Sequence, residues 1–365
     1  MQELLQSDDF RSIVLNETPL IDVRAPVEFE KGAFKNSVNL PLMDNEERRL
    51  VGIEYKNKGN EKAVKLGHTL ISGEIKEKRI QHWLDFKKAH PDAMLYCFRG
   101  GQRSEISQKW LRENNQDIVR LKGGYKAFRN YLMQEIDNSV KYFKPIILGG
   151  RTGSGKTIFL KKIKNSIDLE GLANHRGSSF GRKVTPQPTQ INFENTLAYE
   201  LIQKINDEHK HLLFEDEGKF VGSLYIPKLF AAYLNNAPLI ILQTPLRTRV
   251  QITFDEYITA AQKQYRVVYK EGGMKLWYQD IHSAMKRISR RLGLERYAHL
   301  CKIFDEAFRV QSKTNDCELY KEWIIYLLEE YYDPMYDYQI ENNTKRIVFK
   351  GNADACKEYL ETNII

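Results

Sequence analysis

The chain has few cysteines and no long apolar run, and each shortage excludes a class of protein. Its four cysteines, Cys97, Cys301, Cys317 and Cys356, form no C-x-x-C pair and show no zinc-like spacing. A disulfide framework or a structural metal site is therefore not expected. No run of about 18 apolar residues could span a bilayer, so we expect no membrane anchor. The start lacks the pattern of a signal peptide, which favours a cytoplasmic protein with reduced cysteines.

Positive charge is concentrated in one stretch. The 365 residues carry a formal net charge of +8, and fourteen Lys and Arg face seven Asp and Glu between Arg247 and Lys313. An excess of this kind indicates an anionic partner without naming it.

The order of predicted elements indicates an α/β protein. Apolar strands are predicted at 20–23, 94–97 and 118–121, with a helix after Ser104, and this order favours a parallel sheet covered by helices. The pattern restarts near residue 144, with further strands at 146–148, 211–214 and 239–242. Beyond Arg247 it is mainly helical, with a possible last strand at 345–349. We therefore predict an N-terminal domain at 1–137, a second α/β domain at 144–246 and a helical, basic region at 247–365.

A phosphate-binding loop follows the strand at 146–148. The segment satisfies G-x-x-x-x-G-K-[ST] and lies between a predicted strand and a helix-like segment, as the motif requires. Glycines let successive N–H groups turn toward phosphate oxygens, and the helix N-terminus adds its dipole. ATP, GTP and an organic diphosphate all fit such a loop. The predicted phosphate-binding residues are Gly150, Arg151, Thr152, Gly153, Ser154, Gly155, Lys156 and Thr157.

Magnesium is the predicted cofactor of this loop, and no prosthetic group is expected. Lys156 would balance phosphate charge while the hydroxyl of Thr157 ligates Mg²⁺. A P-loop also needs a carboxylate at the end of a neighbouring strand. Of three acidic residues after the strand at 211–214, we select Asp216 as the metal ligand, with Glu215 and Glu217 in support.

The segment from Cys97 to Ser104, with the sequence CFRGGQRS, lies between a strand and a helix. Arg99, Arg103, backbone N–H groups and a helix N-terminus all favour the thiolate, which is the reactive form. We therefore predict Cys97 as a catalytic nucleophile and the other cysteines as packing residues. The spacing Cys-x₅-Arg-Ser also occurs in protein tyrosine phosphatases, but their signature has a histidine where this chain has Tyr96.

The N-terminal domain resembles the rhodanese family over roughly residues 10–132. The opening segments IDVRAPVEF, from Ile21, and GAFKNSVNLP, from Gly32, and the closing segment LKGGYKAF, from Leu121, match in order. Ordinary single-domain rhodaneses have one residue fewer between the cysteine and the last arginine. The wider loop could admit a tetrahedral anion or a bulkier chalcogen donor.

A rhodanese domain followed by a P-loop domain resembles the tRNA 2-selenouridine synthase family along essentially the whole chain. Further matching segments are HRGSSFG from His175, QPTQINFEN from Gln187 and EDEG from Glu215. The resemblance implies replacement of sulfur by selenium at the wobble 2-thiouridine of tRNA, with selenophosphate as donor and an S-geranylated intermediate made from geranyl diphosphate. It assigns the diphosphate to Lys156 and its neighbours, and selenophosphate to Cys97, Arg99 and Arg103. A selenophosphate-producing enzyme is a further expected partner.

The basic stretch suits the anticodon region of tRNA. Lys286, Arg287, Arg290 and Arg291 lie within two helical turns and are the predicted RNA contacts. Nearby rings could stack on splayed bases, namely those of Tyr257, Tyr265, Tyr269, Trp277 and Tyr278. The segments at 177–181 and 187–195 are expected to be ordered functional loops.

Two other functions remain open at this point. The first is a cysteine phosphatase of rhodanese fold with a nucleotide-binding module, for which hydrolysis of an aryl phosphate would depend on Cys97. The second is a non-catalytic, nucleotide-switched adaptor that binds tRNA without changing a nucleoside.

Overall fold

Two compact units make up the chain in the computed structural model, which describes residues 4–341 and 347–363. The first unit runs to Ser139 and includes a separate later segment, Thr189–Asp207; the second contains Val140–Pro188 and the chain from Glu208 onward. This division differs from the three successive parts predicted from the sequence, for reasons that lie in one helix and one strand.

A five-stranded parallel sheet forms the centre of the first unit, in the order β1, β5, β4, β2, β3. Strand β2, which lies between β4 and β3, is buried along its length, as parallel strands covered by helices on both faces usually are. The strands are β1 Gln6–Ser7, β2 Leu20–Asp22, β3 Ser37–Asn39, β4 Met94–Tyr96 and β5 Val119–Leu121. The helices are α1 Phe10–Leu15, α2 Pro26–Lys31, α3 Asn45–Leu70, α4 Gly73–Ala89, α5 Gln102–Glu113, α6 Gly124–Ser139 and α9 Gln190–Asn206.

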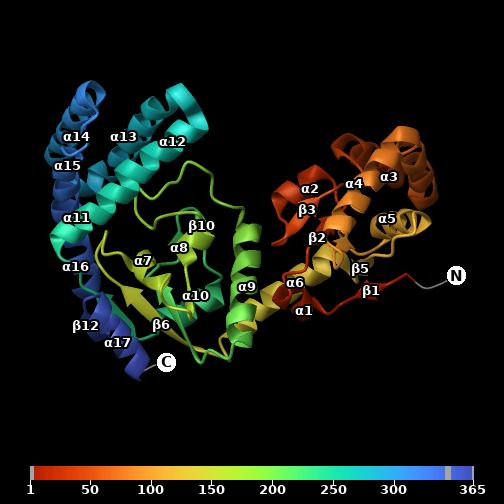
Figure 1. Ribbon diagram of the computed structural model, residues 1–365, viewed down its shortest axis with the longest axis horizontal. Helices are drawn as coiled ribbons and strands as arrows, with labels where there is room; N and C mark the ends of the chain where they lie inside the picture. Colours follow the sequence, from red (N-terminus) through yellow and green to blue (C-terminus); the bar gives the residue numbers. More distant parts are fainter. Residues whose placement is uncertain (1–3, 342–346, 364–365) are drawn as a thin grey trace. The chain divides into compact units, whose positions relative to one another are not determined.

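Helix α9 packs on α6 and α1, although it follows the P-loop in the sequence (Figure 1). Thr189 caps its N-terminus by accepting a hydrogen bond from the backbone N–H of Asn192. Within the first unit, Arg129 of α6 forms an ion pair with Glu194 and donates to the side-chain oxygen of Asn195 at 2.7 Å. The predicted loop at 187–195 is therefore wrong from Gln190 on, because the helix begins there.

A second five-stranded parallel sheet, in the order β12, β11, β6, β8, β7, forms the centre of the second unit. Its strands are β6 Lys144–Gly149, β7 Ser166–Ile167, β8 His211–Glu215, β11 Leu239–Leu242 and β12 Ile347–Gly351, beside an antiparallel pair, β9 Phe220–Val221 and β10 Leu224–Tyr225. Because β12 pairs with β11, the end of the chain returns to the P-loop sheet instead of forming a separate part. The predicted strand at 345–349 is confirmed from Ile347; Lys345 and Arg346 lie outside the described residues.

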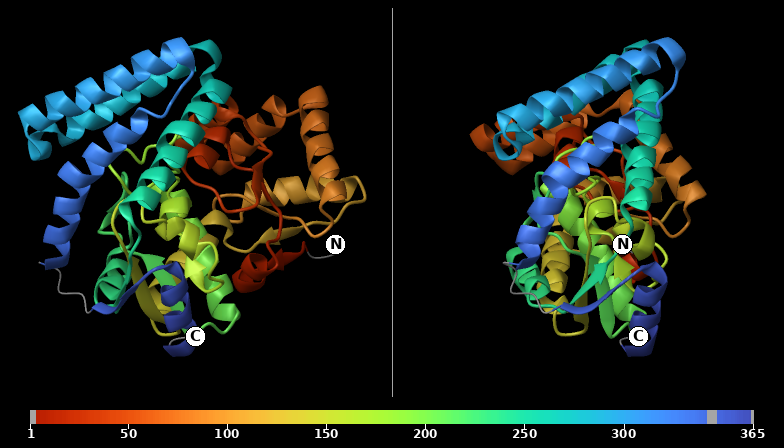
Figure 2. Two further views of the ribbon diagram at one scale, coloured as in Figure 1. Left: turned by 60° about the vertical axis from the view of Figure 1, so that its left-hand side comes forward. Right: turned by 90° about the vertical axis from the view of Figure 1, so that its left-hand side faces the viewer.

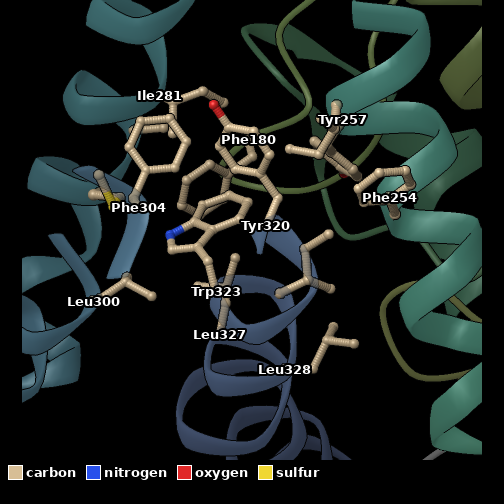
Figure 3. Packing of buried hydrophobic residues seen from close by; sticks show 14 of the residues in the cluster. Phe180, Phe254, Tyr257, Ile281, Leu300, Phe304, Tyr320, Trp323, Leu327 and Leu328 are labelled. Carbon is tan, nitrogen blue, oxygen red and sulfur yellow. The ribbon is translucent and has the colours of Figure 1, made fainter. Parts of the chain in front are cut away.

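Helices α11 to α16 build a second core beside this sheet. Figure 2 shows the C-terminal helices, teal to blue, running alongside one another, and Figure 3 shows the buried rings and aliphatic chains between them. Phe304 and Trp323 have ring centroids 5.2 Å apart and are fully buried, and such aromatic pairs add to the stabilisation from apolar burial. The helices of the second unit are α7 Lys156–Leu160, α8 Leu169–Leu172, α10 Lys228–Asn235, α11 Leu246–Phe254, α12 Ala261–Tyr269, α13 Gly273–Leu292, α14 Leu294–Thr314, α15 Tyr320–Leu327, α16 Asp333–Glu341 and α17 Ala353–Asn363.

The predicted fold class is confirmed: each unit has a parallel sheet with helices, and the second carries a mainly helical C-terminal segment. Among the described residues, no helix combines the length and apolar character needed to cross a bilayer.

Candidate active sites

Cys97 lies directly after β4, at the carboxyl end of a central strand, and its side chain is 3% exposed. The sulfur is 3.2 Å from the hydroxyl oxygen of Ser104, which donates to the carbonyl of Gly101 at 2.9 Å. Helix α5 begins at Gln102, so its N-terminal N–H groups and dipole lie beside the cysteine loop. The predicted loop geometry, a thiol held before a helix N-terminus, is present.

The closing segment of the first unit holds this loop in place. The backbone N–H groups of Tyr125 and Lys126 donate to the carbonyls of Cys97 and Phe98, at 2.9 and 3.0 Å. Gly124 has a φ of +60°, and a side chain there would place its Cβ 2.3 Å from the carbonyl oxygen of Cys97. Glycine is needed because backbone meets backbone at this point. The glycine pair that matches the rhodanese pattern thus shapes the cysteine loop.

The arginines around Cys97 differ in their surroundings. Arg99 is exposed, with its guanidinium carbon 5.9 Å from the ring centre of Phe98. Arg103 donates to Glu28 at 2.7 Å, and Arg48 donates to the same carboxylate at 2.9 Å. Although burial acts to raise it, the pKa of Glu28 lies below its usual value because Arg103 and then Arg48 favour the charged form. An anion that binds Arg103 therefore meets a guanidinium already paired with a carboxylate.

A third arginine, which sequence reasoning missed, holds the cysteine loop through contacts with its backbone and with α5. Arg120 of β5 is buried, forms an ion pair with Glu105 at 3.1 Å and donates to the carbonyl of Gly100. No local motif marks it, because its partners lie on other elements.

The P-loop connects β6, buried from Pro145 to Gly149, to the short helix α7. The ammonium of Lys156 donates to the carbonyl of Gly150 at 2.8 Å, so the lysine side chain folds back over the loop. Gly155 has a φ of +84° at the start of α7, a conformation that side-chain-bearing residues rarely adopt. The structure thus brings together the predicted Gly150, Gly155 and Lys156.

The outer half of the P-loop is fixed by ion pairs that the sequence did not predict. Arg151 pairs with Asp337 at 2.7 Å and with Asp333 at 3.3 Å. The buried Arg249 donates to the carbonyl of Thr152 at 3.0 Å and pairs with Asp333 at 2.6 Å. Helices α11 and α16 therefore stiffen the loop, and the guanidinium of Arg151 is paired with carboxylates of α16. The remaining predicted members, Gly153 and Ser154, lie in the same turn, with the hydroxyl of Ser154 buried.

Carboxylates surround the inner half of the P-loop. The hydroxyl of Thr157 donates to Glu170 at 3.5 Å. Burial, followed by the charge of Glu170, raises the pKa of Glu217 well above its usual value. Burial and then Asp168 do the same for the pKa of Glu215, which accepts a hydrogen bond from the N–H of Leu169 at 3.0 Å. Burial is the main cause of both shifts, and neighbouring carboxylates add to it.

Asp216, the predicted metal ligand, is half-buried directly after β8 and adds to the charge that acts on Glu217. Glu170 accepts the hydrogen bond from Thr157, and sequence reasoning missed it. The sequence does contain a pattern that could have indicated Glu170. Asp168 and Glu170 follow the short strand β7, which lies next to β8 in the sheet. Parallel strands end at one edge, so acidic residues after both strands meet there.

The donor set fits magnesium. In the described part of the chain, no three or more His, Cys, Asp and Glu residues are grouped as a metal cage. Mg²⁺ is usually bound by one or two carboxylates together with waters and substrate phosphates, so a full cage is not required. A hydroxyl at Thr157 and carboxylates at Glu170 and Asp216 would supply hard oxygen ligands of this kind.

The segment 175–181 covers these carboxylates. A Cβ at Gly177, whose φ is +64°, would lie 1.9 Å from one oxygen of Glu170 and 3.1 Å from one of Glu217. The segment also carries cations: the guanidinium of Arg176 is 5.6 Å from the ring centre of Tyr257. Burial, then Lys183 and Arg176, lower the pKa of His175. The P-loop carboxylates therefore have basic neighbours on one side.

Comparison with known proteins covers both units. Residues 143–364 match the family described as tRNA 2-selenouridine synthase AAA domain, and residues 3–131 match the rhodanese-like domain. A tRNA 2-selenouridine synthase of Sulfurovum sp. (strain NBC37-1) is 64% identical over 361 residues, which cover 99% of each chain. Those of Hydrogenovibrio crunogenus and Shewanella halifaxensis are 50% and 44% identical, over 97% and 98% of this chain and 98% and 99% of theirs.

The chain belongs to the tRNA 2-selenouridine synthase family.

The predicted RNA contacts of this family member lie on one helix. Lys286, Arg287, Arg290 and Arg291 are exposed on α13, whose opposite face is buried in the helical core. Arg287 also donates to the carbonyl of Ser179 at 2.8 Å, which links α13 to the segment 175–181. The four cations thus share a helix that touches the cover of the P-loop site.

Most of the predicted stacking rings are not available. Tyr257, Tyr265 and Trp277 are 7%, 6% and 1% exposed and belong to the helical core, because their spacing places them on the inner faces of their helices (Figure 3 labels Tyr257). Tyr278 is half-buried and donates to Asp305. Tyr269 alone of the five is an exposed ring, at 44%. The expectation that Tyr257, Tyr265 and Trp277 stack on bases is wrong.

Proposed function

We propose that this chain is a tRNA 2-selenouridine synthase that replaces the sulfur of a wobble 2-thiouridine by selenium through an S-geranylated intermediate. The observation that carries the proposal is the presence of two differently charged loops, one with a thiol and one a P-loop, in a chain that matches synthases of this name along its length. Transfer of a geranyl group and transfer of selenium need different chemistry, and each loop suits one of them.

The P-loop suits the alkylation step. Its N–H groups and Lys156 would hold the diphosphate of geranyl diphosphate, while Thr157 with Glu170 or Asp216 would hold Mg²⁺. Bound there, the ion would neutralise charge on the diphosphate. In this step the sulfur of 2-thiouridine forms a bond to C1 of the geranyl group, the C1–O bond breaks, and the uridine releases its N3 proton to solvent. The diphosphate leaves with the electron pair, and Lys156 stabilises its developing charge. No nucleoside triphosphate is cleaved.

The cysteine loop suits the selenium step. Over this step a C2–Se bond forms, the C2–S bond breaks, and geranylthiolate leaves with the electron pair and takes up a proton. Cleavage of the P–Se bond of selenophosphate by water releases phosphate. Cys97 would first displace geranylthiolate from C2 and would then itself be displaced by the selenium of selenophosphate, which regenerates its thiolate. The exposed Arg99 and the paired Arg103 are the cations available to selenophosphate. The exposed basic face of α13 is the proposed surface for the tRNA anticodon region.

An omission series tests the whole proposal. The protein is incubated with 2-thiouridine tRNA, geranyl diphosphate, selenophosphate and Mg²⁺, each omitted in turn, and the nucleosides are read by mass spectrometry. The expected result is S-geranyl-2-thiouridine without selenophosphate, 2-selenouridine with all components and no change without geranyl diphosphate. Selenouridine that forms at full rate without geranyl diphosphate would remove the intermediate from the proposal. Hydrolysis of an aryl phosphate, or tight RNA binding with unchanged nucleosides, would favour a phosphatase or an adaptor.

A further inference from the structure

A cavity of about 540 Å³ lies in the first unit beside the helix that follows the cysteine loop. Its walls come from α3, from the start of α5 and from the segment that precedes α3. Apolar side chains dominate the walls, among them Val51, Ile53, Val64, Ile106 and Trp110. Cavities of this size and character are typical of sites for small apolar ligands.

The course of α3 creates the space. The helix bends at Gly59, whose φ of +81° and ψ of −178° are not helical, and residues of both halves line the cavity. Two further glycines face it: a Cβ at Gly52 would meet no atom within 4 Å, and one at Gly67 would come no closer than 3.8 Å, to Val51. Glycine within a helix costs stability relative to alanine. The two positions therefore keep room that larger residues would fill.

The walls are left partly uncovered. Ile53 and Tyr55 are 46% and 59% exposed. Leaving such side chains in water forgoes the free energy that apolar burial provides. An apolar ligand would cover them.

Cys97 belongs to an apolar cluster that also forms part of the cavity wall. The cluster that contains Cys97 also contains Leu42, Met43 and Trp110, all of which line the cavity. Gln102 and Arg103, the first residues after the cysteine loop, line it as well. A ligand that fills the cavity therefore reaches the start of α5, which directly follows the cysteine loop.

The end of the cavity at the start of α5 carries positive charge. Arg48 and Arg103 both line the cavity and share the single carboxylate of Glu28. Two guanidinium groups facing one carboxylate leave a net positive charge. The cavity thus suits an apolar chain joined to an anionic group such as a nucleotide.

We propose that this cavity binds the geranyl chain of the S-geranylated uridine while the nucleotide is presented to Cys97. The inference rests on the proposed function, which supplies the chain, and adds the site that receives it. Selenophosphate, a small anion without apolar surface, would gain nothing from these walls. The same cavity gives the enzyme a way to prefer the alkylated RNA over its 2-thiouridine precursor.

Binding of two RNAs tests the assignment. An anticodon stem-loop with S-geranyl-2-thiouridine and one with 2-thiouridine are titrated by fluorescence anisotropy against the full chain. Wild type is expected to bind the geranylated RNA about 100-fold more tightly, since the buried chain has ten carbons. Gly67→Phe and, independently, Gly52→Phe fill the cavity from positions with free space. Each is expected to remove most of this preference while the affinity for the 2-thiouridine RNA stays unchanged.

Asn57→Phe is the matched control, because it adds the same ring to the exposed side of the same helix, outside the cavity. It should keep the wild-type preference. The assignment is overturned if wild type shows no preference, or if either phenylalanine variant with a wild-type circular dichroism spectrum keeps it in full. The assignment is also overturned if the phenylalanine variants lose alkylation by geranyl diphosphate but bind geranylated RNA as wild type does. The cavity would then bind geranyl diphosphate instead. Failure of wild type to convert geranylated RNA to selenouridine would instead reject the proposed function.

Discussion

The cysteine loop and the P-loop are built alike and charged differently. Each follows a buried central strand of a parallel sheet, turns through glycines with positive φ and ends at a helix N-terminus. Arginines surround the first loop, and one of them is held by Glu28. Carboxylates surround the second, where Glu215 and Glu217 have raised pKa values. The backbone alone would bind an anion in both places, so the side chains decide what else each loop requires.

The difference teaches which partner each loop needs. A loop with a thiol and guanidinium groups is ready for an anionic donor without a metal. A loop with one lysine and several close carboxylates offers oxygen ligands to a cation that could accompany a diphosphate. The following changes break or sharpen this contrast, in order of decreasing effect.

Cys97→Ser should separate the two loops most strongly. We expect 2-selenouridine formation to fall about 1,000-fold or more, since the hydroxyl is a far weaker nucleophile. S-geranylation, assigned to the other loop, should stay within about twofold. Both nucleosides are quantified by mass spectrometry, with Cys301→Ser as the control. Wild-type yield of selenouridine from Cys97→Ser would remove Cys97 from the reaction.

Lys156→Ala should give the reciprocal result. We expect S-geranylation to fall about 100- to 1,000-fold, because the positive charge that stabilises the leaving diphosphate is lost. Conversion of chemically geranylated tRNA to selenouridine should remain near wild type. The two steps are measured separately, and Lys162→Ala, an exposed lysine of the same segment, serves as the control. Equal losses in both steps would show that the loops are not independent.

Glu170→Gln and Asp216→Asn should identify the carboxylate that holds Mg²⁺. The variant that removes a ligand is expected to need about tenfold more Mg²⁺ for half-maximal alkylation. Since Glu170 contacts Thr157, we expect the larger change there. Initial rates of alkylation are followed across a Mg²⁺ titration, with chelator as the zero point. An unchanged titration curve for both variants would place the ion elsewhere.

Glu28→Gln should change stability by a smaller amount and in a pH-dependent way. Arg103 and Arg48 keep the pKa of Glu28 low in the folded chain, so its contribution is complete above the usual carboxyl pKa, roughly 4.3. It is lost as the pH falls through the folded pKa. We expect the free energy of unfolding to drop by about 1–2 kcal/mol at pH 7 and the difference to shrink as the pH falls through the lowered pKa of Glu28.

Urea unfolding of the wild type and variant at several pH values measures this difference. Glu46→Gln removes a carboxylate from the exposed ion pair with Arg49 and should leave the stability close to wild type. A difference for Glu28→Gln that persists unchanged at pH 3 would mean that the Arg103 pair is not its source.

The sequence predicts the two loops well because their chemistry is local. Lys156 and Thr157 stand at fixed spacing from the glycines, and Cys97 stands directly before its helix, so strand, loop and helix are read together. The roles of Glu28 and Glu170 are not local. Arg103 and Glu28 are far apart in the sequence, and only the folded sheet brings them together. Partners of this kind have no motif.

Aromatic residues show the same limit. Tyr257, Tyr265 and Trp277 lie in a basic stretch, which favours a role in RNA binding, yet the helical core takes all three. A large ring gains more free energy from burial than from an exposed position, so composition alone misassigned them. The lysine and arginine side chains of α13 are exposed as predicted, since their charges are costly to bury.

Because helix α9 belongs to the first unit but follows the P-loop in the sequence, the two units cannot be separated by cutting the chain once. The chain passes from one unit to the other near residues 139, 188 and 207, so no single cut yields two complete pieces. A fragment that stops at Ser139 would lack α9 and leave Arg129 without its partners Glu194 and Asn195. Cassette-style recombination at the apparent domain border would therefore produce a damaged rhodanese unit. Any fragment that keeps the rhodanese unit whole, through Asp207, therefore also contains the P-loop.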